Sequence, residues 1–398
     1  MLRLRSACAI WILAATPAAA PAQFVNGQAA FRVLGQPDFR DFYVGQGATS
    51  MTLPSALALD LPHAKLYVAD SGSNRVLRFA WPVAADAPAA EVVFGQTGFG
   101  SCSGNSGDPG ATTMFDPQAI AVDTNGTLYV ADTNNHRVLE FPAAHLATAH
   151  GTSASRVLGQ PRFTTRDQDA TTTGMNFPRG LAWEAPDRLW VADGAANRVL
   201  RFDNVSRDAD GASADGVLGQ RDFTTTTPGA GATKFDSVWG LAVHGGTLFV
   251  ASVGSHRIMR FDNAAAKADG AAADGVFGQA DLAGTGFGTI AARLRHPAGV
   301  ATDVTGRLYA ADFFNHRVLV YGDAVAGPDG ANAAFVLGQS DFVRRQSGQT
   351  DRDLNRPQGV AVDSVNGIVA VADTQNNRVV LYRATGPVSS TAVTKADH

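Results

Sequence analysis

The sequence predicts an all-β fold, a six-bladed β-propeller in which each blade is a four-stranded antiparallel sheet. Three observations carry this prediction. Three short segments recur six times in a fixed order, their period is close to 60 residues, and they are apolar on both faces. Such a repeat indicates an architecture in which every unit packs against its neighbours.

One marker residue identifies each copy of the three recurring segments. The first reads V-A-D-x-x-x-N-R-V-L-x-F, and its arginine is Arg75, Arg137, Arg198, Arg257, Arg317 and Arg378. The second reads V-L/F-G-Q, and its glutamine is Gln36, Gln96, Gln160, Gln220, Gln279 and Gln339. The third reads P-x-G-V/L-A and begins at Pro54, Pro117, Pro178, Val238, Pro297 and Pro357.

Each repeat is expected to supply four strands, a to d. Examples are 359–363 for strand a, 128–132 for b, 198–202 for c and 217–220 for d. The strands are rich in Val, Leu, Tyr and Phe and are separated by Gly, Asn and Asp. They lack polar alternation, as expected of a blade sandwiched between two others. Glycines in strand a are expected where backbones crowd near the axis, at Gly180, Gly240 and Gly299.

The order of the segments predicts how the ring closes. A d-type segment at 31–36 precedes any strand a, and the chain ends with strands a, b and c through Tyr382. We therefore expect the N-terminal segment to complete the last blade, which leaves no large exposed edge. The propeller should span 23–383, and the tail at 384–398, which has no apolar pattern, is expected to be disordered.

Residues 1–22 read as a secretory signal peptide, so we expect a secreted or periplasmic protein. Arg3 and Arg5 precede a short apolar run, and Ala20-Pro21-Ala22 fits a cleavage site. No other stretch is long enough to span a membrane. Losing 1–22 changes the formal net charge from −4 to −6, which argues against nucleic acid as a partner. The mature chain keeps one cysteine, Cys102, and is expected to be a monomer.

The P-x-G-V-A-V-D, L-Y-V-A-D and N-x-R-V unit resembles NHL repeats over residues 30–383. Order, spacing and copy number all agree with this family, which implies the propeller fold. The period is longer than the forty-odd residues that the resemblance implies. The surplus lies in the connection after strand d, such as 37–53, and in the c–d hairpin, such as 203–216.

Residues shared by the copies are interpreted as structural. An aspartate at the end of strand b stands five residues before the arginine at Asp70, Asp132, Asp193, Asp312 and Asp373. We expect it to accept hydrogen bonds from turn amides and to pair with the arginine. The repeated glutamine is expected to bond backbone between blades, and the residue that follows it by three should fill the core. In the fourth copy Ser252 replaces the aspartate, which is either tolerated drift or leaves Arg257 free for an anionic ligand.

A slot that differs between copies can hold one specific site. Directly after the first position of each strand a stand Ser55, Gln118, Arg179, Trp239, Ala298 and Gln358. These residues should ring one mouth of the central channel, where His296, Phe313 and Phe314 also depart from the repeat. The sequence therefore predicts a candidate ligand-binding mouth, with Trp239, Arg179 and the Phe pair at its centre. The alternative is that all of them are ordinary loop residues.

No metal ligand set is predicted, and no cofactor is expected. His136, His256 and His316 share one slot with Asn74, Asn197 and Asn377, which favours a turn hydrogen bond, and His244 takes an aspartate slot. No three histidines, and no histidine with carboxylates, stand at zinc-ligand spacing. Calcium is considered only at Asp208, Asp210 and Asp215. Similar Asp-Gly pairs at Asp269 and Asp329 favour hairpin turns there.

The leading functional hypothesis is a non-catalytic binding module for a protein, peptide or glycan. The alternative comes from the resemblance, since some similar six-bladed propellers are lyases or lactonases with zinc or calcium at the channel. The histidine cluster expected of the amidating lyases is absent, and the strand-a carboxylates read as repeat consensus at Asp60, Asp123, Glu184, Asp303 and Asp363. An assembly role as an envelope scaffold is a third interpretation.

Overall fold

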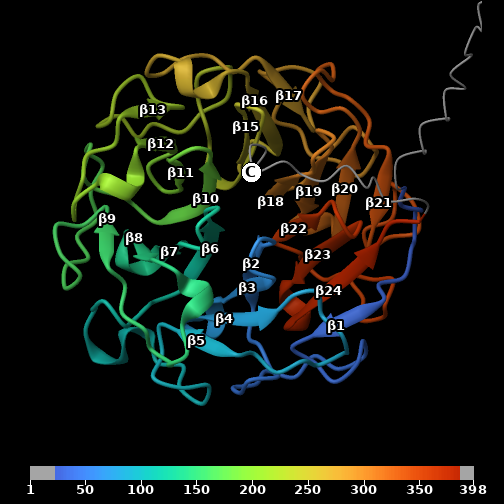
Figure 1. The fold of residues 1–398 in the computed structure, drawn as a ribbon. Helices are drawn as coiled ribbons and strands as arrows, with labels where there is room; N and C mark the ends of the chain where they lie inside the picture. Colours follow the sequence, from blue (N-terminus) through green and yellow to red (C-terminus); the bar gives the residue numbers. More distant parts are fainter. Residues whose placement is uncertain (1–22, 386–398) are drawn as a thin grey trace, which may run out of the picture.

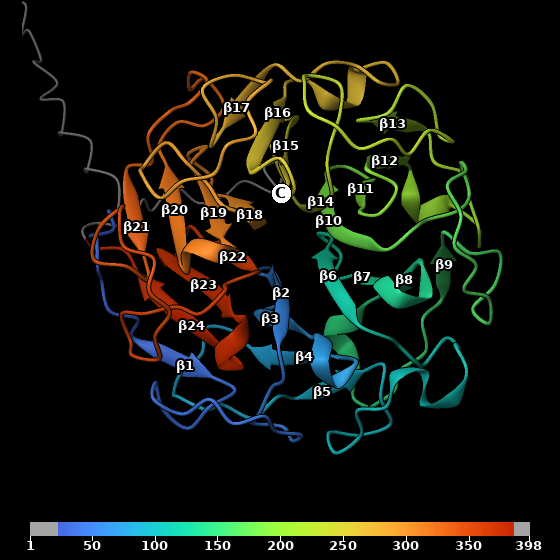
Figure 2. The same cartoon turned by 180° about the vertical axis from the view of Figure 1, so that it is seen from behind.

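The computed structural model describes residues 23–385, which form a closed ring of six four-stranded antiparallel sheets around a central axis (Figure 1 and, from the other side, Figure 2). The predicted fold class and blade number are confirmed. The predicted signal peptide at 1–22 and the tail from residue 386 lie outside the described residues.

The strands of each blade run outward from the axis in the order a, b, c, d. Blade 1 is β2 (Pro54–Asp60), β3 (Lys65–Asp70), β4 (Arg75–Ala80) and β5 (Val92–Phe94). Blade 2 is β6 (Pro117–Val122), β7 (Leu128–Asp132), β8 (Arg137–Phe141) and β9 (Arg156–Leu158). Blade 3 is β10 (Pro178–Glu184), β11 (Arg188–Asp193), β12 (Arg198–Asp203) and β13 (Gly216–Leu218).

The remaining three blades follow the same plan. Blade 4 is β14 (Val238–His244), β15 (Thr247–Ser252), β16 (Arg257–Phe261) and β17 (Gly275–Phe277). Blade 5 is β18 (Pro297–Thr302), β19 (Leu308–Asp312), β20 (Arg317–Tyr321) and β21 (Phe335–Leu337). Blade 6 is β22 (Val360–Asp363), β23 (Ile368–Asp373), β24 (Arg378–Arg383) and, as its outer strand, β1 (Arg32–Leu34).

The N-terminal strand closes the ring as predicted. β1 pairs antiparallel with β24, with Val33 opposite Val380, and Figure 1 shows the blue strand β1 beside the red strand β24. A second link joins the ends, because the backbones of Gln23 and Thr385 exchange hydrogen bonds of 3.0 and 2.7 Å. Backbone pairing between the two ends of the described chain therefore extends to Thr385, two residues past the predicted propeller boundary at residue 383.

The core is divided into six apolar clusters, each between two adjacent blades. The middle strands β7 and β8 are buried along their whole length, which explains why they show no polar alternation. Near the axis the blades touch through backbone. A Cβ on Gly180 would lie 1.8 Å from the carbonyl oxygen of Trp239, and one on Gly299 would lie 2.1 Å from that of Gln358. Glycine is therefore required where it was predicted.

Strand d is shorter than the V-L-G-Q pattern predicted. In blade 3 it ends at Leu218, because Gly219 adopts a left-handed conformation with φ of 83°. The next residue, Gln220, donates to the carbonyl oxygens of Asn197 and Thr227. The side-chain amide of Gln220 thus links the b–c turn of its own blade to the connection that leads to the next strand a. The prediction that this glutamine bonds the backbone of a neighbouring blade is therefore wrong.

The repeated aspartate and arginine form a fully buried ion pair in five blades. In blade 3, Asp193 Oδ2 lies 2.8 Å from Arg198 Nε. Burial raises the pKa of Asp193 to about 6, opposed by the charge of Arg198, so the carboxylate is ionised at neutral pH. Asp193 Oδ1 accepts the N–H of Asn176, and Arg198 donates to Phe223 and Gly174 oxygens. The amide therefore comes from the d–a connection and not, as expected, from the b–c turn.

The shared His/Asn slot links neighbouring blades. His136 Nδ1 accepts the N–H of Phe177 at 3.1 Å, and Asn197 Oδ1 accepts that of Ser237 at 2.8 Å. In both cases the donor stands directly before strand a of the next blade. For His136 the expected side-chain hydrogen bond is thus made to the next blade, while its backbone N–H donates to the oxygen of Thr133 within the turn. Asn and His are interchangeable here because each offers one acceptor at the same place.

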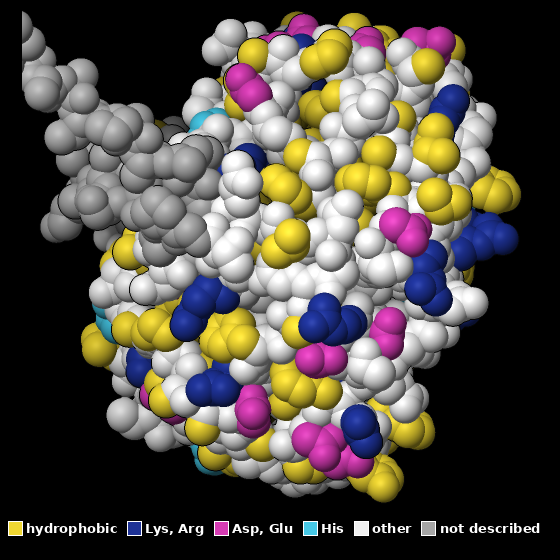
Figure 3. Space-filling model, turned by 90° about the vertical axis from the view of Figure 1, so that its right-hand side faces the viewer, with side chains coloured by type: hydrophobic (Ala, Val, Ile, Leu, Met, Phe, Trp, Pro, Cys, Tyr) yellow, Lys and Arg dark blue, Asp and Glu magenta, His cyan; other side chains and the backbone are white. Residues whose placement is uncertain are grey.

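Among residues 23–385, no helix has the length and apolar character needed to cross a bilayer. One lateral face of the ring carries basic, acidic and apolar side chains intermixed, without a field of one charge (Figure 3).

Candidate functional site

The variable slot of strand a lies at one mouth of the channel. A cavity of about 100 Å³ is lined there by three consecutive residues from each blade, beginning at Ser55, Gln118, Arg179, Trp239, Ala298 and Gln358. In blades 1 to 5 the register of strand a shifts at this slot, as at a β-bulge. A bulge turns the extra residue out of the ladder, which is how these side chains come to face the mouth.

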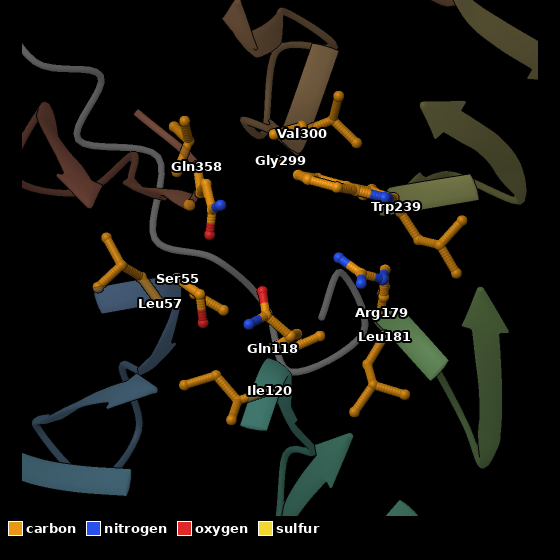
Figure 4. Close-up of a pocket in the computed structure, with 18 residues that line it drawn as sticks. Ser55, Leu57, Gln118, Ile120, Arg179, Leu181, Trp239, Gly299, Val300 and Gln358 are labelled. Carbon is orange, nitrogen blue, oxygen red and sulfur yellow. The ribbon is translucent and has the colours of Figure 1, made fainter. Parts of the chain in front are cut away.

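The centre of the mouth is polar and aromatic. Figure 4 shows Gln118, Arg179, Trp239 and Gln358 pointing from four different blades toward one another. The Arg179 guanidinium carbon lies 5.0 Å from the centre of the Trp239 ring, a cation–π contact. Below this layer, small residues are followed by a ring of aliphatic side chains, among them Leu57, Ile120 and Leu181.

From Trp239 a series of ring contacts runs outward over blades 4 and 5. Trp239 meets Phe313 at 6.2 Å and Phe313 meets Phe314 at 4.9 Å between ring centres. His296 packs against Phe314 at 4.6 Å and against His256 at 4.6 Å.

Two further arginines cover the outer part of this series. Arg295 lies over Phe287 and Phe314, and Arg356 over Phe313 and Phe314, at 4.9 to 5.8 Å. We call the whole set the cationic–aromatic strip, made up of Arg179, Trp239, Phe313, Phe314, His296, His256, Phe287, Arg295 and Arg356.

The charges of the strip are partly balanced by carboxylates. Burial raises the pKa of Asp116, against the effect of the Gln118 hydrogen bond and the charge of Arg179. Burial also lowers the pKa of His256 and of His296 below 6.5, so both rings are neutral at pH 7. The strip itself contains three arginines and no carboxylate, while the charge of Asp116 acts on Arg179 and that of Asp236 on His256 and His296, so the strip carries positive charge.

The predicted site residues fall into two groups. Gln118, Arg179, Trp239 and Gln358 meet at the mouth, and Phe313 and Phe314 continue the surface outward. Ser55 lines the same cavity but is buried, and its hydroxyl donates to the carbonyl oxygen of Pro117 at 3.1 Å. His296 is not among the residues that line the cavity, and its ring packs edge-on against Phe314.

His256, which the repeat led us to interpret as a turn residue, belongs to the strip, and three further members, Phe287, Arg295 and Arg356, were not predicted from the sequence. They lie in the long d–a connections, whose sequences differ too much between blades for the repeat to place them. The only available signal was that aromatic and basic residues occur in the connections on either side of blade 5.

The opposite mouth opens into a larger cavity of about 610 Å³, lined by residues that include Asp60, Asp123, Glu184, His244 and Asp303. These carboxylates are engaged in their own blades. Asp123 and Asp303 accept amides of their a–b turns, and Glu184 binds Trp190 and Arg188. The structural interpretation is therefore consistent with the contacts of Asp123, Asp303 and Glu184, whereas Oδ2 of Asp60 has no hydrogen-bond partner.

Two further interpretations can be compared with the structure. Arg257 is fully buried and donates to the carbonyl oxygens of Gly231 and Lys234, so it is not open to an anionic ligand. In the calcium candidate, Asp210 accepts the N–H of Val157 in the preceding blade. Asp269 and Asp329 accept the equivalent amides of their preceding blades, so this position serves to join blades.

Comparison with known proteins identifies the repeat. The NHL repeat family matches residues 116–141, 294–321 and 354–382, which cover strands a to c of blades 2, 5 and 6. NHL repeat-containing protein 2 of Bos taurus is 24% identical over 387 residues, covering 87% of this chain and 49% of the relative. The Homo sapiens protein is 25% identical over 361 residues, covering 83% and 46%. The chain thus spans about half the length of the curated relatives it matches.

Solved structures of similar shape include a gluconolactonase from Xanthomonas campestris, with 16% identity, a TM-score of 0.48 and coverage of 94% of this chain and 99% of that one. A streptogramin B lyase has 11% identity, a TM-score of 0.47 and coverage of 86% and 96%. The repeat motifs, their match to the family and the closed ring together show that this chain is an NHL repeat protein with a six-bladed β-propeller fold.

Proposed function

We propose that this chain is a non-catalytic binding module, exported from the cytoplasm, that holds an acidic peptide segment of a protein partner across the cationic–aromatic strip. The observation that carries the proposal is the unbroken series of contacts from Arg179 through Trp239, Phe313 and Phe314 to the covering arginines Arg295 and Arg356.

The shape of the mouth favours a ligand that lies across it. Its cavity of about 100 Å³ is well below the roughly 300–1,000 Å³ of pockets that enclose small molecules. The ring of aliphatic side chains beneath it offers no polar side chain at the bottom. The eighteen residues that line this cavity include no carboxylate, histidine or cysteine, the groups from which a general base or nucleophile is usually drawn.

The composition of the strip favours an acidic segment. Arginine recognises carboxylates through planar, paired hydrogen bonds, and Trp and Arg are the residue types most enriched at interface hot spots. Phe287 is 58% exposed at the outer end of the strip, and Arg356 is also exposed. An extended acidic peptide with apolar side chains could pair with the arginines and cover these rings.

The test uses an array of 12-residue peptides in acidic, neutral and basic versions of the same sequences, with a glycan array in parallel. We expect selective retention of acidic peptides, lost by about tenfold or more in the double variant Arg179→Gln/Trp239→Ala. The matched control is Arg221→Gln/Trp183→Ala, which removes an exposed arginine and a tryptophan of the opposite mouth. Equal binding by the double variant, retention of glycans alone, or no retention would overturn the proposal.

A further inference from the structure

Two histidines and an aspartate meet between blades 1 and 2, away from the strip. Asp60 ends β2, His63 lies in the turn that follows, and His145 lies in the short helix η4 (Ala144–Leu146) of blade 2. Their ligand atoms all lie within 4.8 Å of one another. His63 Nδ1 lies 2.7 Å from Asp60 Oδ1, and the two imidazole rings stack with centres 3.6 Å apart.

The repeat provides a control for this cluster. The slot of His63 holds Gly126, Asp187, Thr247, Gly306 and Asn366 in the other blades. The slot of His145 holds Val83, Ser206, Ala265 and Val325 in blades 1, 3, 4 and 5. The shared architecture therefore needs a histidine at neither place, and both histidines occur at the one junction where they face each other.

The cluster also contains polar atoms that the protein leaves unsatisfied. Asp60 is 1% exposed, and its Oδ2 has no hydrogen-bond partner, nor has the buried Nδ1 of His145. The equivalent carboxylates of blades 5 and 6 are satisfied. Asp303 Oδ2 accepts the hydroxyl of Tyr309, and Asp363 Oδ2 accepts the indole N–H of Trp81. A buried acceptor without a partner is unfavourable, so the unpaired Oδ2 of Asp60 is available to a ligand.

The chain also makes room for the imidazole of His145. A Cβ on Gly126 would lie 2.1 Å from His145 Nδ1, and Gly126 has a φ of 77°. A side chain at position 126 would therefore displace the ring from the cluster.

We propose that Asp60, His63 and His145 bind a divalent transition-metal ion, with Zn²⁺ the best match. Two imidazoles and one carboxylate are a ligand set typical of zinc, with a fourth position left for water or another ligand. A ligating nitrogen holds the ion in its ring plane, so the stacked rings turn relative to each other on binding. His145 loses no hydrogen bond at Nδ1 when it turns. The ion joins the a–b turn of blade 1 to the c–d hairpin of blade 2.

The nearby charges leave this site accessible to a cation. Arg78 donates to the carbonyl oxygen of Ala144, next to His145, but its charge is shared with Glu91, which also binds Lys65.

The experiment measures zinc binding by the full chain prepared without a histidine tag and stripped with chelator. Calorimetric titration with ZnCl₂ is expected to give one ion per chain. His145→Ser and His63→Asn, which copy blades 3 and 6, should each weaken binding by about tenfold or more. His244→Gln, which removes a histidine outside the cluster, should bind as the parent chain does. Circular dichroism of each variant checks that the ring is folded.

A second measurement separates specific from general binding. Zinc should raise the melting temperature of the parent chain and of His244→Gln, but not that of the double variant His63→Asn/His145→Ser. The proposal is overturned if the parent chain shows no saturable zinc binding, or if the double variant binds zinc and is stabilised by it to the same extent.

Discussion

Arg179 and Trp239 stand on the innermost strands of blades 3 and 4, and the guanidinium of the first lies 5.0 Å from the ring centre of the second. Both occupy the slot at which strand a shifts register. The contact joins two blades at the axis and begins the cationic–aromatic strip. We expect the contribution of this contact to ligand binding to depend on the planar guanidinium of Arg179 lying over the wide indole ring of Trp239.

Conservative changes at these two positions should therefore differ in effect. Arg179→Lys keeps the charge but loses the planar group, so we expect affinity for the acidic peptide to fall by about tenfold. Trp239→Phe keeps a ring for the cation and should cost only about threefold. Fluorescence anisotropy with a labelled peptide measures both. The reverse order would show that charge alone, and not the stacked geometry, governs binding.

The fourth blade lacks the buried aspartate of the other five, and Arg257 Nε is buried without a hydrogen-bond partner. We expect Ser252→Asp to restore the ion pair and to raise the melting temperature by roughly 2–4 °C, as for a gain of about 1.5 kcal/mol. Asp193→Ser, which copies blade 4 into blade 3, should cost about 3–5 kcal/mol because it leaves Arg198 buried and unpaired. A lower melting temperature for Ser252→Asp would show that Asp236 already serves as the partner of Arg257.

Ring closure by β1 predicts a large loss of stability when this strand is removed. Deleting residues 23–36 exposes the edge of β24 and the apolar cluster that contains Val33. We expect a melting temperature at least about 10 °C lower and concentration-dependent aggregation through the open edge. Arg32→Gln, which changes a polar neighbour and keeps the strand, is the control. An unchanged melting temperature after the deletion would contradict closure.

The histidines that link blades predict a defined acid sensitivity. Burial lowers the pKa of His136, His256 and His316 below the unfolded value of about 6.5. The unfolded chain then binds more protons, so stability falls as pH drops below about 6.5 through the folded pKa values. Protonation of Nδ1 also removes the acceptor for the next blade.

Replacing all three by asparagine keeps an acceptor and removes the titration. Melting temperatures of the parent chain and of the triple variant should agree near pH 8 and diverge below pH 6.5, with the variant more stable. Parallel curves over this range would show that these histidines do not link folding to pH.

The fold could be predicted because the sequence contains six copies of one unit, so the residues that every blade needs recur at the same positions. The exchange of His136 with Asn197, for example, predicted a hydrogen bond in the turn, and the structure shows both side chains accepting an amide that precedes strand a of the next blade. The end of strand d was predicted less accurately from the V-L-G-Q segment. The strand pattern alone did not show that Gly219 turns the backbone and ends the strand at Leu218. Likewise, the partner amide of Asp193 lies in a connection that the repeat does not describe.

The candidate site was predictable in its inner ring and, through departures from the repeat, at Phe313, Phe314 and His296. Arg179 and Trp239 share a repeat slot, so their positions follow from the blade geometry. Phe287 depends on the course of a long connection, and the meeting of His145 with Asp60 depends on contact between two blades. A linear spacing rule for metal ligands does not detect residues brought together in this way.

The location of the ligand is the central claim, and hydrogen exchange with mass spectrometry tests it most directly. Exchange is compared with and without the acidic peptide that the array retains. We predict protection of segments 238–240, 286–296 and 313–316, which carry the strip, and unchanged exchange at 183–185 and 243–246 around the opposite mouth. Protection at the opposite mouth, with exchange in the strip unaltered, would contradict the account.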